Sequence, residues 1–192
     1  MSYFEHPQSR MGSNCTKWDR YIPRWNMDDV VALWVADMDF ECPKEVSEAI
    51  IQRAKHPIYG YTDASESCIQ EIIKWEKRHH DVELKSEDIV FTTGVVYAMY
   101  TAIETFLKQD EKVLVMTPVY PPFFNIPITL NREVVYCPLN HDAMNFEYME
   151  EQLKNDSKIK MMIFCYPHNP IGKSWTKDVC QVKETKTLFQ RP

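Results

Sequence analysis

The second half of the chain alternates short apolar runs with stretches of helical spacing. The apolar runs DIVFTTG, KVLVMTP, REVVYCPL and KIKMMIFCYP predict strands at 88–92, 112–117, 133–137 and 159–165. Helical spacing occupies the intervals GVVYAMYTAIETFLK, PPFFNIPITLN and NFEYMEEQLKND. This alternation with short connections predicts an α/β domain with a mostly parallel sheet. Because the strands are almost continuously apolar, we expect helices on both faces of the sheet.

The first half of the chain follows a different pattern. Residues 1–40 contain many aromatic residues and few helical signals, which indicates an irregular arm. The segment PKEVSEAIIQRAKH begins with Pro43 and then spaces its apolar residues as an amphipathic helix does. A second amphipathic helix is predicted for SESCIQEIIKWEKRHHD, with Ser65 or Ser67 as its N-cap.

Composition and charge narrow the classes of partner. At 192 residues, the chain can form one domain with a substantial core, or one domain and a fragment of another. Its 28 acidic and 22 basic residues give a net charge of -6, so we expect neither nucleic acid nor an anionic membrane as a partner. No apolar run approaches the roughly 20 residues of a membrane span, and MSYFEHPQSR lacks the pattern of a signal peptide. The 6 cysteines form no Cys-x-x-Cys pair, which favours reduced thiols in the cytoplasm and no metal site.

In parallel sheets, ligands bind at the carboxyl ends of the strands, which directs attention to residues 92–96, 117–121 and 166–172. The first of these, TTGVV, opens a predicted helix. Its backbone N–H groups and the helix dipole can hold a phosphate. The alternative interpretation is a tight turn in which Gly94 serves for steric reasons alone.

The other two strand ends carry an aromatic residue and an amide. Tyr120 can stack on a flat heteroaromatic ring, although packing under its proline-rich turn is the favoured interpretation of this residue alone. Asn169 lies between two prolines that keep its backbone extended, and its amide can donate a hydrogen bond to a phenolate oxygen. The following Gly-Lys-Ser is not a P-loop, because Pro167 stands where that motif requires glycine.

Together these segments resemble a known family. NCTKWDR, LWVADMDF, YGYT, TTGVVYA, TPVYPPFF and PHNPIGKSWT, in this order, resemble the fold-type-I pyridoxal-phosphate enzymes of the class I/II aminotransferase superfamily. The resemblance is most specific to the cystathionine β-lyase-like carbon–sulfur lyases, a branch that includes the maltose-regulon modulator. It implies a three-layer α/β/α, PLP-dependent transferase-like fold with a mostly parallel sheet, incomplete in this chain. It also implies an N-terminal arm and small-domain segment at 1–45 and a partial cofactor-binding large domain at 46–176.

The resemblance implies a role for each matching residue of the large domain. Gly94, Val95 and Val96 would offer backbone donors to the phosphate of pyridoxal 5′-phosphate. Tyr120 would stack on the pyridine ring, and Asn169 would hydrogen-bond the 3′ oxygen of the cofactor.

The resemblance also implies a homodimer with a small amino acid as substrate. Tyr61 would reach the cofactor phosphate of the neighbouring subunit. Ala36 and Asp37 would lie near the substrate entrance, with Asp37 as a structural hydrogen-bonding group rather than an acid–base catalyst.

Three groups essential to the family follow its Asn-Pro-x-Gly turn: the Schiff-base lysine, an aspartate on the pyridinium nitrogen, and an arginine for the substrate carboxylate. We expect none of them in this chain, and therefore assign no catalytic residue. The pair Ser157-Lys158 precedes Asn169, so it is expected to be a solvated turn. Residues 177–192 show neither the helix nor the strand that the family pattern would continue with, which indicates an aberrant tail.

The activity implied by the resemblance is β-elimination from cystathionine or cysteine S-conjugates, with release of a thiol, pyruvate and ammonia. The chain alone is expected to be inactive without the lysine. Two alternatives stay open at this point. One is an aminotransferase, and the other is a non-catalytic, truncated fragment that binds a full-length partner.

Overall fold

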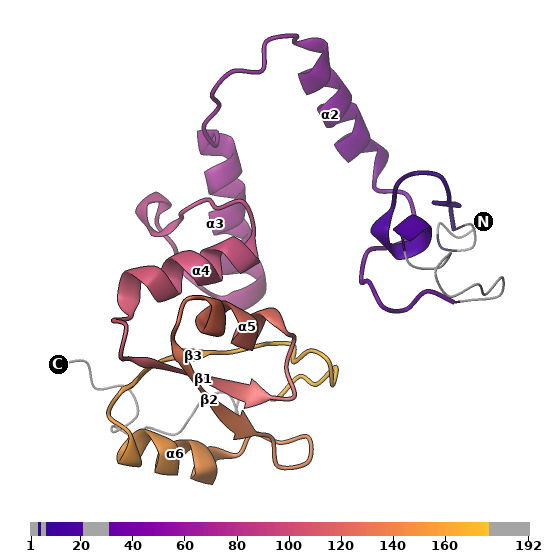
Figure 1. Ribbon diagram of the computed structural model, residues 1–192. Coiled ribbons are helices and arrows are strands. Elements are labelled where there is room, and N and C mark those ends of the chain that lie inside the picture. The colour runs from indigo at the N-terminus through magenta and orange to yellow at the C-terminus, as the bar shows by residue number, and fades with distance from the viewer. Residues whose placement is uncertain (1–3, 5–6, 21–30, 177–192) are drawn as a thin grey trace. The chain divides into compact units, whose positions relative to one another are not determined.

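The computed structural model describes residues 4, 7–20 and 31–176 (Figure 1). They belong to two compact units, residues 1–64 and 65–192. The predicted tail at 177–192 lies outside the described residues, and the predicted domain boundary after residue 45 stays a prediction. Over the ranges described, no helix is both long and apolar enough to cross a membrane.

A parallel sheet of three strands forms the centre of the second unit. The strands are β1 (Lys112–Thr117), β2 (Glu133–Pro138) and β3 (Ile159–Ile163), in the order β2-β1-β3. These match three of the predicted strands to within two residues. The prediction of a parallel sheet is thereby confirmed.

The strand predicted at 88–92 is wrong. Ser86–Asp88 forms a short 3-10 helix, η3, and the residues after it are not assigned to a strand. Val90 in this segment is 83% exposed. An apolar run becomes a strand only where a neighbour pairs with its backbone, and no strand of the described residues pairs with this segment.

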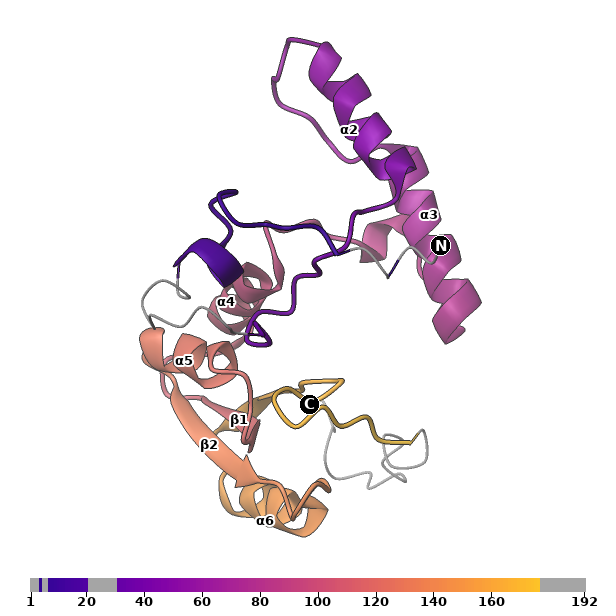
Figure 2. The same cartoon turned by 90° about the vertical axis from the view of Figure 1, so that its right-hand side faces the viewer.

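Helices cover both faces of the sheet. In Figures 1 and 2, α4 (Val95–Phe106) and α5 (Pro122–Thr129) lie on one face and α6 (Phe146–Asn155) on the other. The connections from β1 to β2 and from β2 to β3 run in opposite directions along the sheet. Because such crossovers are right-handed, that reversal places their helices on opposite faces.

β1 supplies the middle of both apolar layers. Val113 and Val115 pack with α4 and α5, whereas Leu114 and Met116 pack on the face of α6. All four side chains are buried, as alternation along a central strand requires. Burying one such side chain contributes about 1.5–3 kcal/mol, so β1 stabilises the unit through both of its faces.

Charged groups fix the amino-terminal edge of the sheet. The Lys112 Nζ donates to Glu133 on β2 at 2.7 Å and pairs with Asp156, just after α6, at 2.9 Å. These hydrogen bonds raise the pKa of Lys112, and the Lys112 ammonium in turn lowers the pKa of Asp156. The buried Arg132 guanidinium donates to the carbonyls of Leu130 (2.6 Å) and Leu107 (3.1 Å).

The predicted helix α3 (Glu66–His80) is present, and it lies at the start of the second unit. Its N-cap is Ser65, whose Oγ accepts a hydrogen bond from the Cys68 N–H at 3.2 Å. The helix ends at Asp81, which adopts a left-handed conformation (φ 55°). The choice left open between Ser65 and Ser67 is therefore settled for Ser65.

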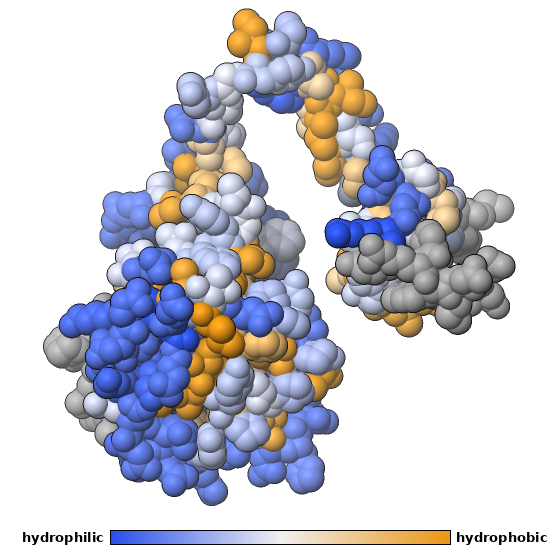
Figure 3. All heavy atoms as spheres, viewed as in Figure 1, coloured by the Kyte–Doolittle hydropathy of each residue, from blue (hydrophilic) through white to orange (hydrophobic). Residues whose placement is uncertain are grey.

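The first unit contains the five-residue π-helical turn η2 (Thr16–Arg20) and the predicted helix α2 (Lys44–Lys55). No residue of α2 is buried within the unit. Val46, Ile50 and Ile51 leave large apolar side chains exposed, and Figure 3 shows hydrophobic residues along this helix.

Candidate functional site

The loops that follow β1 and β3 meet at the carboxyl edge of the sheet. β1 and β3 are parallel neighbours, so their loops leave the sheet side by side. The Tyr120 N–H donates to the Asn169 carbonyl at 2.9 Å. This bond brings together two of the residues singled out from the sequence. The Tyr120 side chain is 45% exposed and Asn169 is exposed too, so both can reach a ligand.

The turn that carries Asn169 is closed by its own backbone. The Gly172 N–H donates to the His168 carbonyl, and the His168 N–H donates to the Lys173 carbonyl, both at 2.8 Å. Gly172 has φ +65°, in the left-handed region that glycine adopts without strain. The Asn169 N–H donates to the buried Cys165 Sγ at 3.4 Å, and this bond ties the backbone of Asn169 to the chain just past the end of β3.

Trp175 anchors this turn to the apolar core. Its ring is buried in the layer between the sheet and α6, together with Leu114 and Met116. Its Nε1–H donates to the Asp142 carbonyl at 3.2 Å, and its own carbonyl accepts from the Tyr166 hydroxyl at 2.9 Å. The turn is therefore part of the folded core rather than a free surface loop.

His168 is a site residue that sequence reasoning did not single out. Only 1% of it is exposed, and its Nε2 lies 2.7 Å from the Pro118 carbonyl oxygen. Since a carbonyl oxygen only accepts, Nε2 carries the hydrogen. The letters Pro-His-Asn-Pro marked this turn, but nothing in their spacing shows that the imidazole points inward toward the loop after β1.

Gly94 and the first residues of α4 form the third predicted element. Gly94 has φ 155° and ψ 165°, a backbone conformation confined almost entirely to glycine. A Cβ placed on it would meet no atom within 4 Å, so its backbone conformation, rather than crowding, requires glycine here.

The first N–H groups of a helix have no partner within the helix. At α4 no side chain of the described residues caps them, and Val95 is 76% exposed. Figure 1 shows α4 beginning on the side of the unit where β1 and β3 end. The donors of Gly94, Val95 and Val96 therefore lie at the same edge as the loops of Tyr120 and Asn169.

The remaining predicted residues, Tyr61, Ala36 and Asp37, belong to the first unit. Tyr61 is fully exposed, and Ala36 is exposed. Asp37 forms an ion pair with Arg10, and its carbonyl accepts from the Lys17 Nζ at 3.0 Å. Their proposed functional roles stay predictions.

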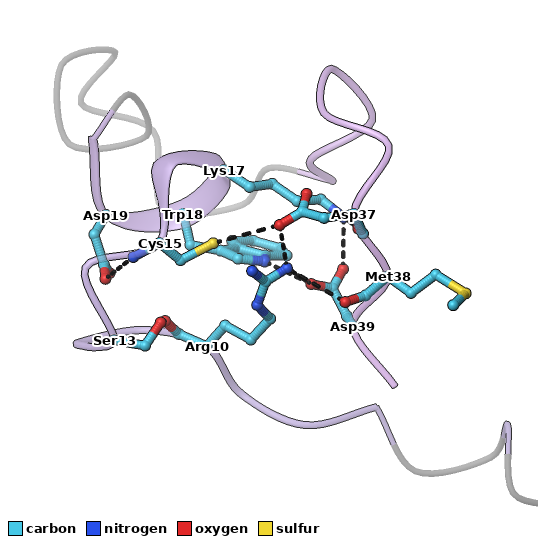
Figure 4. A network of polar contacts seen from close by, with 9 residues as sticks. All are labelled: Arg10, Ser13, Cys15, Lys17, Trp18, Asp19, Asp37, Met38 and Asp39. Atoms are coloured by element: carbon cyan, nitrogen blue, oxygen red, sulfur yellow. Dashed lines mark hydrogen bonds and ion pairs between the residues drawn. The ribbon is translucent and has the colours of Figure 1, made fainter. Parts of the chain in front are cut away.

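Around Asp37 lies a wider polar network centred on Asp39 (Figure 4). The Asp39 carboxylate accepts from the Lys17 Nζ at 2.8 Å and from the Trp18 Nε1–H at 2.9 Å, with Arg10 at 3.4 Å. The Lys17 ammonium, followed by the Trp18 indole, lowers the pKa of this carboxyl. The network holds η2 against residues 37–39.

The described residues contain no group of three or more His, Cys, Asp or Glu side chains that could hold a metal ion. In this part of the chain, the free thiols are those of Cys15, Cys42, Cys68, Cys137 and Cys165.

Comparisons with known proteins agree with the resemblance inferred from the motifs. The family model described as aminotransferase class I and II matches residues 28–187. Cystathionine beta-lyase PatB of Bacillus subtilis is 33% identical over 179 residues, which are 91% of this chain and 46% of PatB. Protein MalY of Escherichia coli is 28% identical over 184 residues, which are 93% of this chain and 47% of MalY. The chain thus spans about half the length of the curated relatives it matches.

Among solved structures, cystalysin from Treponema denticola, which contains a pyridoxal 5′-phosphate cofactor, superposes with a TM-score of 0.85 at 34% identity. The match covers 94% of this chain and 48% of cystalysin. The predicted fold, with a parallel sheet between helical layers that is incomplete in this chain, is confirmed.

Proposed function

Because the chain belongs to the class I and II aminotransferase family, we propose that it forms part of a pyridoxal-phosphate-dependent carbon–sulfur β-lyase. Its substrates would be cystathionine or cysteine S-conjugates, and its products a thiol, pyruvate and ammonia. The observation that carries the proposal is the edge of the sheet where the Tyr120 N–H donates to the Asn169 carbonyl. The start of α4 lies at that same edge.

The chemistry of this edge fits the cofactor. A phosphate group needs several converging N–H donors, and the start of α4 offers those of Gly94, Val95 and Val96 together with the positive end of the helix dipole. The open space beside Gly94 leaves room for the phosphate to approach the backbone.

The other two residues would orient the ring. Stacking on the exposed face of Tyr120 contributes about 0.5–1.5 kcal/mol beyond area burial. The Asn169 amide would donate to the phenolate oxygen beside the reacting carbon. The backbone bond between these residues brings the loops that carry the ring and the amide side by side.

When bound, pyridoxal phosphate supplies an electron sink that stabilises a carbanion at the α-carbon of an amino acid. Residues of the described part hold and orient the group, and none of them is assigned to proton transfer. In the proposed homodimer, Tyr61 would reach the phosphate of the second subunit, and Ala36 and Asp37 would line the substrate entrance.

Cofactor binding by the 192-residue chain tests this proposal. We expect saturable quenching of protein fluorescence by pyridoxal 5′-phosphate, weakened roughly 2- to 10-fold by Tyr120→Ala, as loss of a stacking contact predicts. Asn169→Ala should weaken binding by roughly 10-fold or more, because it removes one hydrogen bond to a charged oxygen. The matched control is Tyr136→Ala, since Tyr136 has the same 45% exposure but lies on β2. Equal affinities in all four proteins would refute the assignment of the site.

In an assembled enzyme that also supplies the Schiff-base lysine, the products distinguish a lyase from the alternative, an aminotransferase. Cystathionine treated by a lyase yields pyruvate and a free thiol, which a thiol reagent detects. An aminotransferase would instead pass the amino group to an added keto acid and leave the carbon–sulfur bond intact. Transfer to the keto acid without release of a thiol would favour the alternative.

A further inference from the structure

His168 is a buried polar residue to which the proposed function gives no role. It precedes Asn169 in the chain, yet its side chain points away from the exposed edge and toward the loop after β1. A buried polar side chain usually has a hydrogen-bond partner that offsets the loss of water. What this side chain contacts is therefore informative.

Two hydrogen bonds join the loop after β1 to the loop after β3. One runs from the His168 Nε2–H to the Pro118 carbonyl (2.7 Å), and the other from the Tyr120 N–H to the Asn169 carbonyl (2.9 Å). The donors alternate: each loop gives one hydrogen and accepts one. Such a pair fixes both the separation and the relative rotation of the two loops, which one bond alone does not.

The imidazole is itself held on its remaining sides. Its ring meets Trp175 edge to face, with 5.4 Å between centroids and 70° between planes. The backbone N–H and carbonyl of His168 are both engaged within the turn. Nδ1 is buried and has no hydrogen-bond partner among the described residues, so the polar contact of the ring is the one made by Nε2.

We propose that His168 is a positioning residue that sets the distance between the Tyr120 ring and the Asn169 amide through its bond to the Pro118 carbonyl. This inference rests on the proposed function, in which those two groups meet the ring and the 3′ oxygen of one cofactor. With 1% of its surface exposed, His168 would touch neither the cofactor nor the substrate. It acts by keeping the two loops in register.

Two substitutions separate the hydrogen bond from the bulk of the ring. His168→Leu fills the buried space without a donor, whereas the amide of His168→Gln can donate from nearly the position of Nε2. We expect His168→Leu to weaken pyridoxal phosphate binding roughly 10-fold, the effect of one buried hydrogen bond, and His168→Gln to bind within about 3-fold of wild type. His80→Leu, a change at the exposed end of α3, is the control and should bind as wild type.

A second readout does not depend on the cofactor. Hydrogen exchange of the Tyr120 amide should be at least about 10-fold faster in His168→Leu, while the Val115 amide in β1 keeps its protection. The exchange experiment tests the role of His168 separately from the proposed function. Failure of wild type to bind the cofactor would refute the proposed function, and the exchange experiment would still decide the role of His168.

The inference is overturned if His168→Leu matches wild type in both affinity and Tyr120 exchange. It is also overturned if His168→Gln is as impaired as His168→Leu, because the donor would then be irrelevant. Should His168→Leu not fold, His168→Asn takes its place, since its shorter amide does not reach Pro118. Loss of binding in His168→Asn but not in His168→Gln supports the role, and equal behaviour of the two contradicts it.

Discussion

Each of the two units of the chain is stabilised by a different kind of interaction. In the second unit, β1 carries a buried side chain on each face of the sheet in turn, from Val113 to Met116. In the described part of the first unit, the buried apolar residues are Cys15 and Ala32. There the Asp39 carboxylate, with its partners Lys17 and Trp18, takes the place of an apolar core.

This difference shows which part of the chain can be stable by itself. Apolar burial contributes in proportion to area and does not depend on the ionisation of side chains. Ion pairs near a surface contribute little, and salt and acid weaken them. We therefore expect the second unit to account for the cooperative unfolding of the chain, and the first unit to respond to solution conditions.

The largest expected effect comes from opening the core at β1. Leu114→Ala should lower the free energy of unfolding by about 2–5 kcal/mol, through lost burial and the cavity left behind. Urea unfolding followed by far-ultraviolet circular dichroism measures this change. Val90→Ala is the control, because an 83% exposed side chain should change stability by no more than about 0.5 kcal/mol. Equal effects of the two would contradict an apolar core centred on β1.

The second-largest effect on stability is expected at the backbone where α4 starts. Gly94→Ala forces a side chain into a conformation near φ 155°, which costs about 1–3 kcal/mol, although its Cβ would meet no neighbour. Thermal unfolding measures the cost. A variant as stable as wild type would show that open space, rather than backbone conformation, decides this position.

A smaller effect is expected at the cap of α3. Ser65→Ala removes the hydrogen bond to the Cys68 N–H and should cost about 1 kcal/mol. The same urea experiment detects this loss, and Ser157→Ala in the exposed turn before β3 serves as the control. If Ser65→Ala and its control unfold at the same urea concentration, the cap does not contribute to stability.

The smallest effect is the response of the first unit to acid. The pKa of Asp39 is lowered by Lys17 and Trp18, so the folded carboxylate binds a proton less readily than the unfolded one. Its stabilising contribution is therefore present above the ordinary aspartate pKa of about 3.9 and is lost as the pH falls through the lower folded value. The nuclear magnetic resonance signal of the Trp18 indole N–H should move in that range.

Asp39→Asn sharpens this test, because the amide keeps the shape but does not titrate. In this variant the shift of the Trp18 signal between pH 5 and pH 2 should disappear. The amide signals of Leu114 and Val115, in the buried middle of β1, should stay in place in both proteins over the range where Trp18 first moves. Simultaneous loss of both sets of signals would mean that the two units do not respond separately.

Local patterns predicted the elements whose neighbours lie close in the sequence. The strands at 112–117 and 133–137 and the helix between them followed from apolar spacing, and a cap at Ser65 or Ser67 followed from the serines before α3. The error at 88–92 arose because pairing depends on residues distant in sequence, which an apolar run does not reveal.

The candidate site likewise contains residues that the sequence predicts and one that it does not. Tyr120 and Asn169 stand out because they end predicted strands and belong to a family motif. His168 does not, since its partner Pro118 lies 50 residues away and its burial depends on Trp175. A buried histidine that bridges two loops becomes evident only when the loops are placed side by side.

The strand order β2-β1-β3 places the strand that is synthesised first at the centre of the sheet, which affects how the sheet assembles during synthesis of the chain. Of the three strands, β1 emerges first. Lys112 of β1 pairs with Glu133 of β2, which lies 21 positions later in the chain, and with Ile159 of β3, which lies later still. The added loop-closure entropy is below about 1 kcal/mol, so delay rather than free energy separates the two pairings. On the ribosome, the α6 side of β1 stays uncovered until residues 146–155 emerge. We therefore expect the nascent sheet to form from its centre outward, with the turn that carries Asn169 ordered after β1 and β2 have paired.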